Sequence, residues 1–405
     1  MIDAAEDPMI DARFEPRGPR LRLAWMEEWM STLAREILPY LAERHEITYV
    51  TSGDEIPAAG FARVIRCRRR RQMNLAGFEI SRRVNELYRR GEIDLALAWA
   101  SIGFALRGVP FINFEGTSVY AEIGLFASRR PWHARPRFLP GLLHYALPEM
   151  LSNRRAERVV VPSEALKRDV VRLHRLPARR VEVVHHGVEP RHQNLYDRKF
   201  DRGLRPSIVF VGRLHFRKGI AELLREFVRR PDIAADFQIA GDGPDRAAME
   251  SLAAGDARVT IRGSIGRDEL DRLLRGTNIF VLPTWYEGFG LSLLEAMASG
   301  HACIVYDIPV VREVLGDCGI MVPVGDTAAL VRELSRLTRD REAIADLASR
   351  AHRRAALFSW GDAQVAIDRI VRETAAGLAT VGARGLDAAR LRRDLPGAQA
   401  PTVQP

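Results

Sequence analysis

Short apolar runs alternate with longer amphipathic stretches along most of this 405-residue chain, and the alternation starts afresh near the middle. The runs have the length of β-strands, and the stretches between them carry apolar residues at helical spacing. Strands that alternate with helices in this way form parallel sheets with helices on both faces. We therefore predict an α/β fold of two doubly wound, Rossmann-like domains that face each other across a cleft. Ligands are expected at the carboxyl ends of the strands.

The predicted elements fall on both sides of a polar segment that contains Pro190 and Pro206. In the first half, strands are expected at residues 21–25, 47–50, 64–65, 95–99, 111–114, 159–162 and 181–185, and helices at 30–44, 78–90 and 164–173. Ser163 is the expected N-cap of the last of these helices. In the second half, strands are expected at 208–212, 237–240, 259–262, 279–282 and 302–306, and helices at 221–229, 246–254, 267–276, 291–299, 328–339 and 362–378.

Changes in composition predict the domain boundaries. The residues after Gly382 are rich in Ala, Arg and Pro, a composition typical of disorder. The predicted segments are a flexible N-terminus at 1–19, a first domain at 20–190, a linker at 191–207, a second domain at 208–361, a C-terminal helix at 362–381 and a disordered tail at 382–405.

The positive charge of the chain is unevenly placed. The net charge is +9, and residues 1–200 hold 33 basic against 25 acidic residues. A basic half favours an anionic partner such as a membrane surface, a nucleic acid or an acidic acceptor. Only three of the basic residues are lysines, namely Lys167, Lys199 and Lys218, a skew typical of a coding bias toward Arg. Each is a candidate for a position that needs a compact ammonium group.

The cysteines and the hydropathy exclude several classes of protein. The three cysteines, Cys67, Cys303 and Cys318, are widely spaced and form no C-x-x-C, which excludes a disulfide framework and argues against a zinc site. No apolar run reaches the length of a membrane span, and residues 1–19 lack the basic start and apolar stretch of a signal peptide. We therefore expect a cytoplasmic protein.

The first motif with chemical meaning spans residues 212–219, between a predicted strand and a predicted helix. It opens with Gly212 and Arg213 and closes with Lys218 and Gly219. Two cations beside the amides of a helix N-terminus form a site for a diphosphate. Arg217 is either a third cation of this site or a solvated side chain, and the whole motif could alternatively be an ordinary basic turn.

The second motif spans residues 283–295 and again runs from a strand through a loop into a helix. Gly288 and Gly290 let the backbone approach a ligand closely, and the helix that starts near Leu291 directs free amides and a positive dipole toward it. Glu287 and Glu295 could each accept hydrogen bonds from a pair of hydroxyl groups. This set suits a nucleotide-sugar, whereas Glu295 alone would be a structural residue of a helix.

Two weaker motifs also follow predicted strands. Gly243 lies in a Gly-Asp-Gly-Pro turn at 241–244, and Ile265 closes a Gly-Ser-Ile loop at 263–265. Both stretches are also consistent with ordinary connecting loops. Their position after strands nevertheless places them at the expected ligand-binding edge.

Together, these motifs resemble those of the retaining glycosyltransferases of family 4, which have the GT-B architecture. The E-x(7)-E spacing from Glu287 to Glu295, with Gly212-Arg213 and Lys218-Gly219, is the most specific part of the resemblance. It extends to Val-Val-Val-Pro-Ser at 159–163, to residues 183–188 and 307–313, and to Phe-Ser-Trp at 358–360.

The resemblance implies a role for each matching position. Arg213 and Lys218 would hold the leaving diphosphate, and Glu287 would contact hydroxyls of the transferred sugar. Glu295 would bind the ribose, and Ile265 would flank the base. The remaining donor-binding positions would be Gly212, Gly243, Gly288, Phe289, Gly290 and Leu291. The domain at 20–190 would take the acceptor, the helix at 362–381 would pack back on it, and no metal or cofactor is implied.

The chain departs from the family pattern in its first half. The family often has a Gly-Gly loop after the first strand, but residues 25–31 contain no glycine. Glu115 precedes Gly116 where many relatives have His, so Glu115 is a candidate catalytic residue that contacts the donor sugar or the acceptor, or else a structural carboxylate. His186 stands where relatives commonly have Asn and is either a structural histidine or a residue at the domain hinge.

Clusters of arginine in the first half favour contact with an anionic membrane, although a solvated Arg-rich surface would explain them equally well. The arginines are Arg63, Arg66, Arg68, Arg69, Arg70 and Arg71, and Arg129, Arg130, Arg135 and Arg137 around Trp132 and His133. Residues 139–151 add an apolar stretch. No nucleic-acid recognition motif accompanies the charge. A peripheral position at the inner membrane face is therefore expected rather than nucleic-acid binding.

The resemblance leads to three hypotheses of function. The first is a metal-independent retaining transferase that moves a hexosyl group from a nucleotide-diphosphate sugar to a glycan or lipid-linked acceptor of the cell envelope or an exopolysaccharide. The second is a non-catalytic relative that binds a nucleotide or glycan as a partner subunit. The third is a GT-B sugar-nucleotide epimerase.

Overall fold

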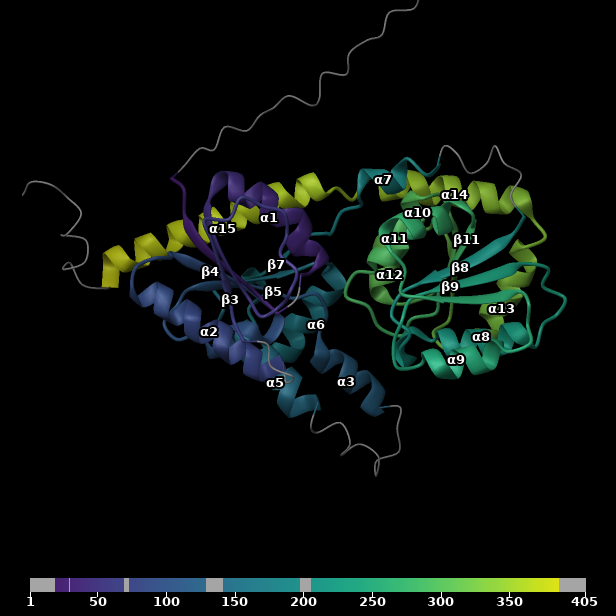
Figure 1. Ribbon diagram of the computed structural model, residues 1–405, viewed down its shortest axis with the longest axis horizontal. Coiled ribbons are helices and arrows are strands. Elements are labelled where there is room, and N and C mark those ends of the chain that lie inside the picture. Colours follow the sequence, from purple (N-terminus) through teal and green to yellow (C-terminus); the bar gives the residue numbers. More distant parts are fainter. Residues whose placement is uncertain (1–18, 29, 69–72, 129–140, 197–204, 386–405) are drawn as a thin grey trace, which may run out of the picture. The chain divides into compact units, whose positions relative to one another are not determined.

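The computed structural model describes residues 19–28, 30–68, 73–128, 141–196 and 205–385 (Figure 1). The predicted flexible N-terminus and disordered tail lie largely outside these residues. Part of the predicted basic surface also lies outside them, namely Arg69, Arg70, Arg71, Arg129, Arg130, Trp132, His133, Arg135 and Arg137.

The first sheet has seven strands in the order β3-β2-β1-β4-β5-β6-β7. The strands are β1 (Arg22–Glu27), β2 (Glu46–Thr51), β3 (Arg63–Arg66), β4 (Leu95–Trp99), β5 (Phe111–Phe114), β6 (Arg158–Val161) and β7 (Val181–Val183). The helices between them are α1 (Thr32–Arg44), α2 (Met73–Arg89), α3 (Val119–Ser128), α5 (Leu147–Arg155) and α6 (Glu164–His174), with a 3₁₀ helix at Ala100–Ala105 and a π-helical turn at Leu142–Ala146. The strand order reverses beside β1, as expected for a doubly wound sheet.

The second sheet has six strands in the order β10-β9-β8-β11-β12-β13. The strands are β8 (Ser207–Val211), β9 (Asp236–Ala240), β10 (Val259–Gly263), β11 (Ile279–Leu282), β12 (Ala302–Tyr306) and β13 (Ile320–Val322). The helices are α8 (Ile220–Val228), α9 (Arg246–Ala253), α10 (Arg267–Arg275), α11 (Leu291–Ala298), α12 (Pro309–Leu315), α13 (Thr327–Leu337), α14 (Arg341–Ala355) and α15 (Trp360–Gly385). Neighbouring strands are parallel, and the order reverses beside β8. Two parallel sheets with flanking helices make this a two-domain α/β fold.

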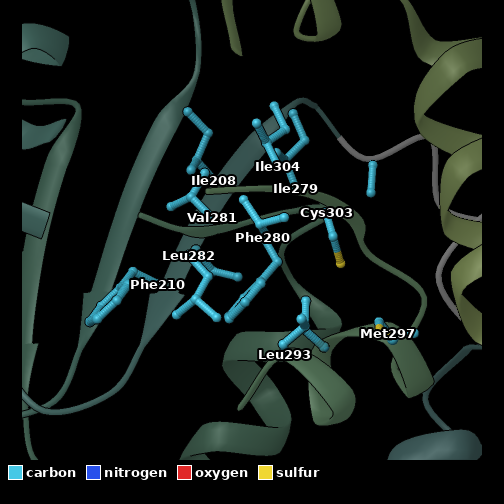
Figure 2. Close-up of a cluster of buried hydrophobic side chains, with 14 of the residues drawn as sticks. Ile208, Phe210, Ile279, Phe280, Val281, Leu282, Leu293, Met297, Cys303 and Ile304 are labelled. Atoms are coloured by element: carbon cyan, nitrogen blue, oxygen red, sulfur yellow. The ribbon is translucent and has the colours of Figure 1, made fainter. Parts of the chain in front are cut away.

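The core of the second sheet explains why its central strands read as unbroken apolar runs. Every residue of β11 and β12 is buried, because helices cover both faces of a parallel sheet. Figure 2 shows Phe280 of β11 and Leu293 of α11 within this core. The core anchors the loops that follow β8 and β11.

The chain divides into two compact units. One comprises residues 1–115 and 119–156, and the other comprises residues 116–118 and 157–385 of the described chain. The division precedes the predicted linker at 191–207. Its position has a local reason: α6 packs against α12, and Val188 pairs with Ser359 in an isolated parallel bridge.

The structure corrects several predicted elements. The strand expected at 181–185 ends at Val183. Beyond it, the backbone at Gly187 lies so close to Trp360 that a Cβ there would be 2.0 Å from the Trp360 amide. Helix α2 begins at Met73 instead of residue 78. The pattern did not predict α3, α5, α7 (Pro190–Gln193), α12, α14 or β13.

Candidate donor site

Two loops that follow neighbouring strands meet at the point where the order of the second sheet reverses. One loop connects β8 to α8 and the other connects β11 to α11. Gly219 has a φ of 62°, and a Cβ on it would lie 2.1 Å from the carbonyl oxygen of Pro283. The Trp285 amide donates to the Arg217 carbonyl at 2.9 Å. The two loops therefore touch through their backbones, which requires glycine at position 219.

Within these loops, Lys218 and Glu287 form an ion pair in which the Lys218 ammonium donates to the Glu287 carboxylate. Their side chains are only 10% and 11% exposed. A charge pair this sheltered is far less screened than one at the surface. The structure thus brings together two of the residues predicted from the sequence.

Arg213 belongs to the same loop as Lys218 but is exposed, and it makes no ion pair or side-chain hydrogen bond with the described residues. Its guanidinium can bind a phosphate in bidentate fashion. An exposed Arg and a sheltered Lys in one loop provide two cations of different kinds for a diphosphate.

The N-terminus of α11 supplies the third component of the predicted anion site. Its N-cap, Gly290, has a φ of 92° and provides no side-chain cap. The first amides of a helix have no carbonyl partner within the helix, so this end of α11 favours an anion. Phe289 is 3% exposed, and its ring packs 5.2 Å from that of His186. Only the backbone of Phe289 is therefore suited to a ligand contact.

The loop before α11 is also held by residues that the sequence analysis did not assign to the site. The Ser163 hydroxyl donates to the Gly288 carbonyl at 2.7 Å and accepts from the Leu166 amide at 3.1 Å. A Cβ on Gly288 would lie 1.8 Å from the carbonyl oxygen of Gly116. Ser163 was predicted as an N-cap, and this is confirmed. Its second bond could not be inferred from a local pattern.

The loops after β9 and β10 reach the same edge of the sheet. Gly243 lies against the β8 loop, where a Cβ would be 2.2 Å from the Leu214 carbonyl oxygen, and Gly241 similarly approaches Gly212. Ile265 follows β10 and is half-buried against the core. These contacts give Gly243 a packing role, and its role toward a ligand stays a prediction, as does that of Ile265.

Glu295 lies on α11, eight positions after Glu287, and its side chain is 25% exposed. Burial raises the pKa of this carboxyl to about 7. Its nearest basic neighbour is the fully buried His192 of α7, whose Nε2 lies 4.0 Å from Glu295 Oε1. No sequence pattern singled out His192.

Glu115 lies in the first compact unit and is 2% exposed. It accepts a hydrogen bond from the Asn153 amide at 3.1 Å, and Asn153 in turn accepts from Asn113 at 2.6 Å. Burial, and then the neighbouring Glu149, raise the pKa of Glu115 well above its ordinary value. A buried carboxyl that is hydrogen-bonded to Asn153 is what a structural role for Glu115 predicts, and a catalytic role for Glu115 stays a prediction.

The segment after β1, where the expected glycines are missing, is occupied by two acidic residues. Glu27 is fully buried and accepts from the Tyr49 hydroxyl at 2.6 Å and from Ser31. Burial raises the pKa of Glu27, and raises that of Glu28 to about 7. This end of β1 is therefore filled by side chains instead of offering open backbone.

The two histidines before Gly187 have different surroundings. His186 is 8% exposed between Phe289 and Trp360, and burial lowers its pKa to about 4. His185 lies 2.9 Å from Glu313, which also accepts from the amides of Glu164 and Ala165. His186 thus packs against the loop before α11 and against α15, and His185 contacts the carboxylate that binds the start of α6.

Within the described ranges, no three His, Cys, Asp or Glu side chains are grouped so that they could hold a metal ion. Searched over the same residues, no helix is both long and apolar enough to cross a bilayer.

The sequence matches two family models. Residues 30–192 match Glycosyltransferase Family 4, and residues 205–340 match Glycosyl transferases group 1. Both halves of the chain thus match glycosyltransferase models, which supports a group 1 glycosyltransferase. An uncharacterized glycosyltransferase of Methanocaldococcus jannaschii is 30% identical over 183 residues, which are 41% of this chain and 46% of that protein. The chain thus spans about half the length of the curated relatives that it matches.

Solved structures share the fold of most of the chain. Sucrose-phosphate synthase from Thermosynechococcus elongatus is similar with a TM-score of 0.68 and 19% identity, over 88% of this chain and 100% of that one. Anabaena HepE, in complex with UDP and glucose, is similar with a TM-score of 0.67 and 16% identity, over 87% of this chain and 100% of that one. At these identities the likeness establishes the GT-B fold.

Proposed function

We propose that this chain transfers a hexosyl group from a nucleoside-diphosphate sugar to a glycan or lipid-linked acceptor, with retention of the anomeric configuration and without a metal. The observation that carries the proposal is the sheltered Lys218–Glu287 ion pair before the open N-terminus of α11, in the same loops as Arg213. The fold shared with HepE, which holds UDP and glucose, supports a sugar-nucleotide donor.

The proposed roles follow from the charges in these loops. Lys218, Arg213 and the first amides of α11 would neutralise the diphosphate as the bond between the sugar C1 and the phosphate oxygen breaks and the electron pair leaves with the diphosphate. Glu287 would accept hydrogen bonds from hydroxyl groups of the sugar. The Lys218 ammonium would donate both to Glu287 and to the diphosphate. The acceptor hydroxyl would form the new bond on the same face, and its proton would pass to the departing diphosphate.

The test follows release of nucleoside diphosphate with UDP-, GDP-, ADP- and dTDP-hexoses and a membrane or glycan extract. We expect Arg213→Ala and Glu287→Gln to lower the rate by about 100-fold or more, as loss of a charge-stabilising group does elsewhere. Arg225→Ala is the matched control, because Arg225 is an exposed arginine on α8. EDTA should leave the rate unchanged, and NMR of the product should show the donor's anomeric configuration.

Other outcomes separate the alternatives. Turnover that survives both substitutions would overturn the proposal. Nucleotide binding without transfer to any acceptor would identify a partner subunit, and conversion of the donor without an acceptor would identify an epimerase.

We also propose that the protein binds its acceptor at the surface of an anionic membrane. The support comes from the first compact unit, where Leu143, Tyr145 and Leu147 are 52%, 42% and 39% exposed, and where Arg66 and Arg68 are exposed. Exposed apolar side chains favour insertion into a bilayer, and basic residues near its surface favour anionic lipids. Flotation with phosphatidylglycerol vesicles should recover the protein, and Leu143→Ser with Tyr145→Ser should reduce recovery. Equal flotation with neutral phosphatidylcholine vesicles would contradict the electrostatic part.

A further inference from the structure

His192 is a buried polar side chain whose ring makes no hydrogen bond with any residue that the structure describes. It lies in α7, the single helical turn after Val188, and is 0% exposed. Neither ring nitrogen has a hydrogen-bond partner among the described residues. An unpaired buried polar group costs free energy, so its presence here needs an explanation.

The charged group that lies closest to this imidazole is the carboxylate of Glu295. His192 Nε2 lies 4.0 Å from Glu295 Oε1, and α7 packs against α11. The Glu295 side chain is 25% exposed while His192 is fully buried, so the ring approaches the carboxylate from the protein side. Within the described chain, the Glu295 carboxylate accepts no hydrogen bond. Two complementary groups that both lack partners thus face each other.

The other charged groups around this pair form ion pairs with one another. Arg191 pairs with Glu189 at 2.9 Å and with Asp271 of α10 at 3.3 Å. Arg267 of α10 lies 3.6 Å from Glu189. These four residues form ion pairs with one another, and among the described residues it is His192, not Arg191 or Arg267, that lies within 4.0 Å of the Glu295 carboxylate.

The charge states agree with this pairing. Burial, and then the positive charge of Arg191, lower the pKa of His192 to about 4, so the ring is neutral near pH 7 and carries one N–H. Glu295, with its pKa near 7, is ionised above that pH. The neutral His192 ring can therefore orient the Glu295 carboxylate through a hydrogen bond without adding a positive charge beside it.

We propose that His192 is a positioning residue for nucleotide binding, whose Nε2–H donates to Glu295 and orients its carboxylate toward the two hydroxyls of a ribose. The inference rests on the proposed function and on the ribose contact that the family resemblance implies for Glu295. The ring and the carboxylate need to approach by about 1 Å to reach hydrogen-bond distance, and contacts of this kind commonly tighten when the ligand binds.

The experiment compares UDP, GDP and ADP with their 2′,3′-dideoxy counterparts by titration calorimetry on the full chain. We expect the wild-type protein to prefer one ribonucleotide over its dideoxy form. In His192→Leu that preference should fall about tenfold, equivalent to about 1.4 kcal/mol. His192→Gln should restore most of it, because its amide places a donor near the position of Nε2. The double variant His192→Leu/Glu295→Gln should lose no more than Glu295→Gln alone.

A purely structural role would give a different result. His174 is a fully buried histidine on α6, and His174→Leu should lower stability without changing ribose preference. A positioning role also predicts a pH effect in His192→Leu. Loss of the N–H removes a donor to the ionised Glu295 carboxylate, so the pH at which the ribose preference is half lost should rise. If His192→Leu does not fold, equal ribose preference in His192→Gln and the shorter His192→Asn would overturn the inference, as would an unchanged preference in His192→Leu.

If the wild-type protein binds no nucleoside diphosphate, the proposed function itself fails and the inference with it. Binding without ribose preference overturns the inference alone.

Discussion

Single carboxyl groups in this protein differ in how burial is compensated. Glu27 is buried but accepts hydrogen bonds from Tyr49 and Ser31. Its neighbour Glu28 has a buried Oε1 with no hydrogen-bond partner in the described chain. Burial is the cause of its raised pKa of about 7. Glu28 is therefore the residue where removal of a charge should improve stability.

We predict that Glu28→Gln stabilises the protein, and more so as the pH rises. The folded-state pKa is raised above its unfolded value of about 4.5, so the group contributes stability below that pH and loses it as the pH rises through about 7. Urea unfolding at pH 5 and pH 8 measures the effect. The gain should be larger at pH 8, whereas Glu43→Gln, at an exposed carboxylate of α1, should show no such difference. An equal gain at both pH values would contradict the prediction.

Among the elements, α6 connects a helix cap to the proposed donor loop. Ser163 caps the helix through the Leu166 amide and also donates to the Gly288 carbonyl. On the same helix N-terminus, Glu313 of α12 accepts the amides of Glu164 and Ala165. The start of α6 thus holds a loop that lies far away in the sequence.

We predict that Ser163→Ala lowers both stability and donor affinity. Loss of the cap and of one buried hydrogen bond should cost about 1–3 kcal/mol, and the KM for the donor should rise because the Gly288 carbonyl is released. Asp340→Ala is the matched control, since Asp340 caps α14 through the Ala343 amide at 2.9 Å without touching this loop. Chemical denaturation and donor kinetics measure the two effects.

The control Asp340→Ala should lose a similar amount of stability and keep its KM for the donor. Ser163→Thr should keep both the stability and the donor KM of the wild-type protein. A donor KM that does not move in Ser163→Ala would show that the bond to Gly288 has no role in the loop.

At the scale of the whole molecule, two compact units raise the question of whether they unfold together. The proposed donor residues Arg213, Lys218, Glu287 and Glu295 all belong to the unit that contains residues 157–385. A ligand stabilises the part of a protein that binds it. Multi-domain chains also commonly depart from a single unfolding transition.

We predict that a nucleoside diphosphate raises the unfolding temperature of only one of two calorimetric transitions. At 100 times the Kd, the gain should be about 2.7 kcal/mol. Hydrogen exchange with mass spectrometry should assign the protected peptides to β8, β11 and α11, and not to β1–β4. Equal protection of both units would contradict the placement of the donor site in the second one.

The sequence by itself determined those features that depend on neighbours along the chain. Apolar periodicity predicted most strands and helices of both sheets, because strand and helix repeats are local properties of the backbone. Ser163 as a cap and Gly290 at a helix start were inferred for the same reason. The E-x(7)-E pattern, through its resemblance to family 4, singled out Glu287 and Glu295, and their roles stay predictions.

Only the tertiary structure decided which distant residues meet and which are shielded from water. Lys218 and Glu287 are separated by 69 positions, and their pairing depends on the contact between Gly219 and Pro283. The sequence likewise contained no sign that Glu115 is buried beside Asn153, or that His192 faces Glu295 without another partner. Burial and hydrogen bonding across the chain result from packing of whole elements, and they set the charge states on which the proposed chemistry depends.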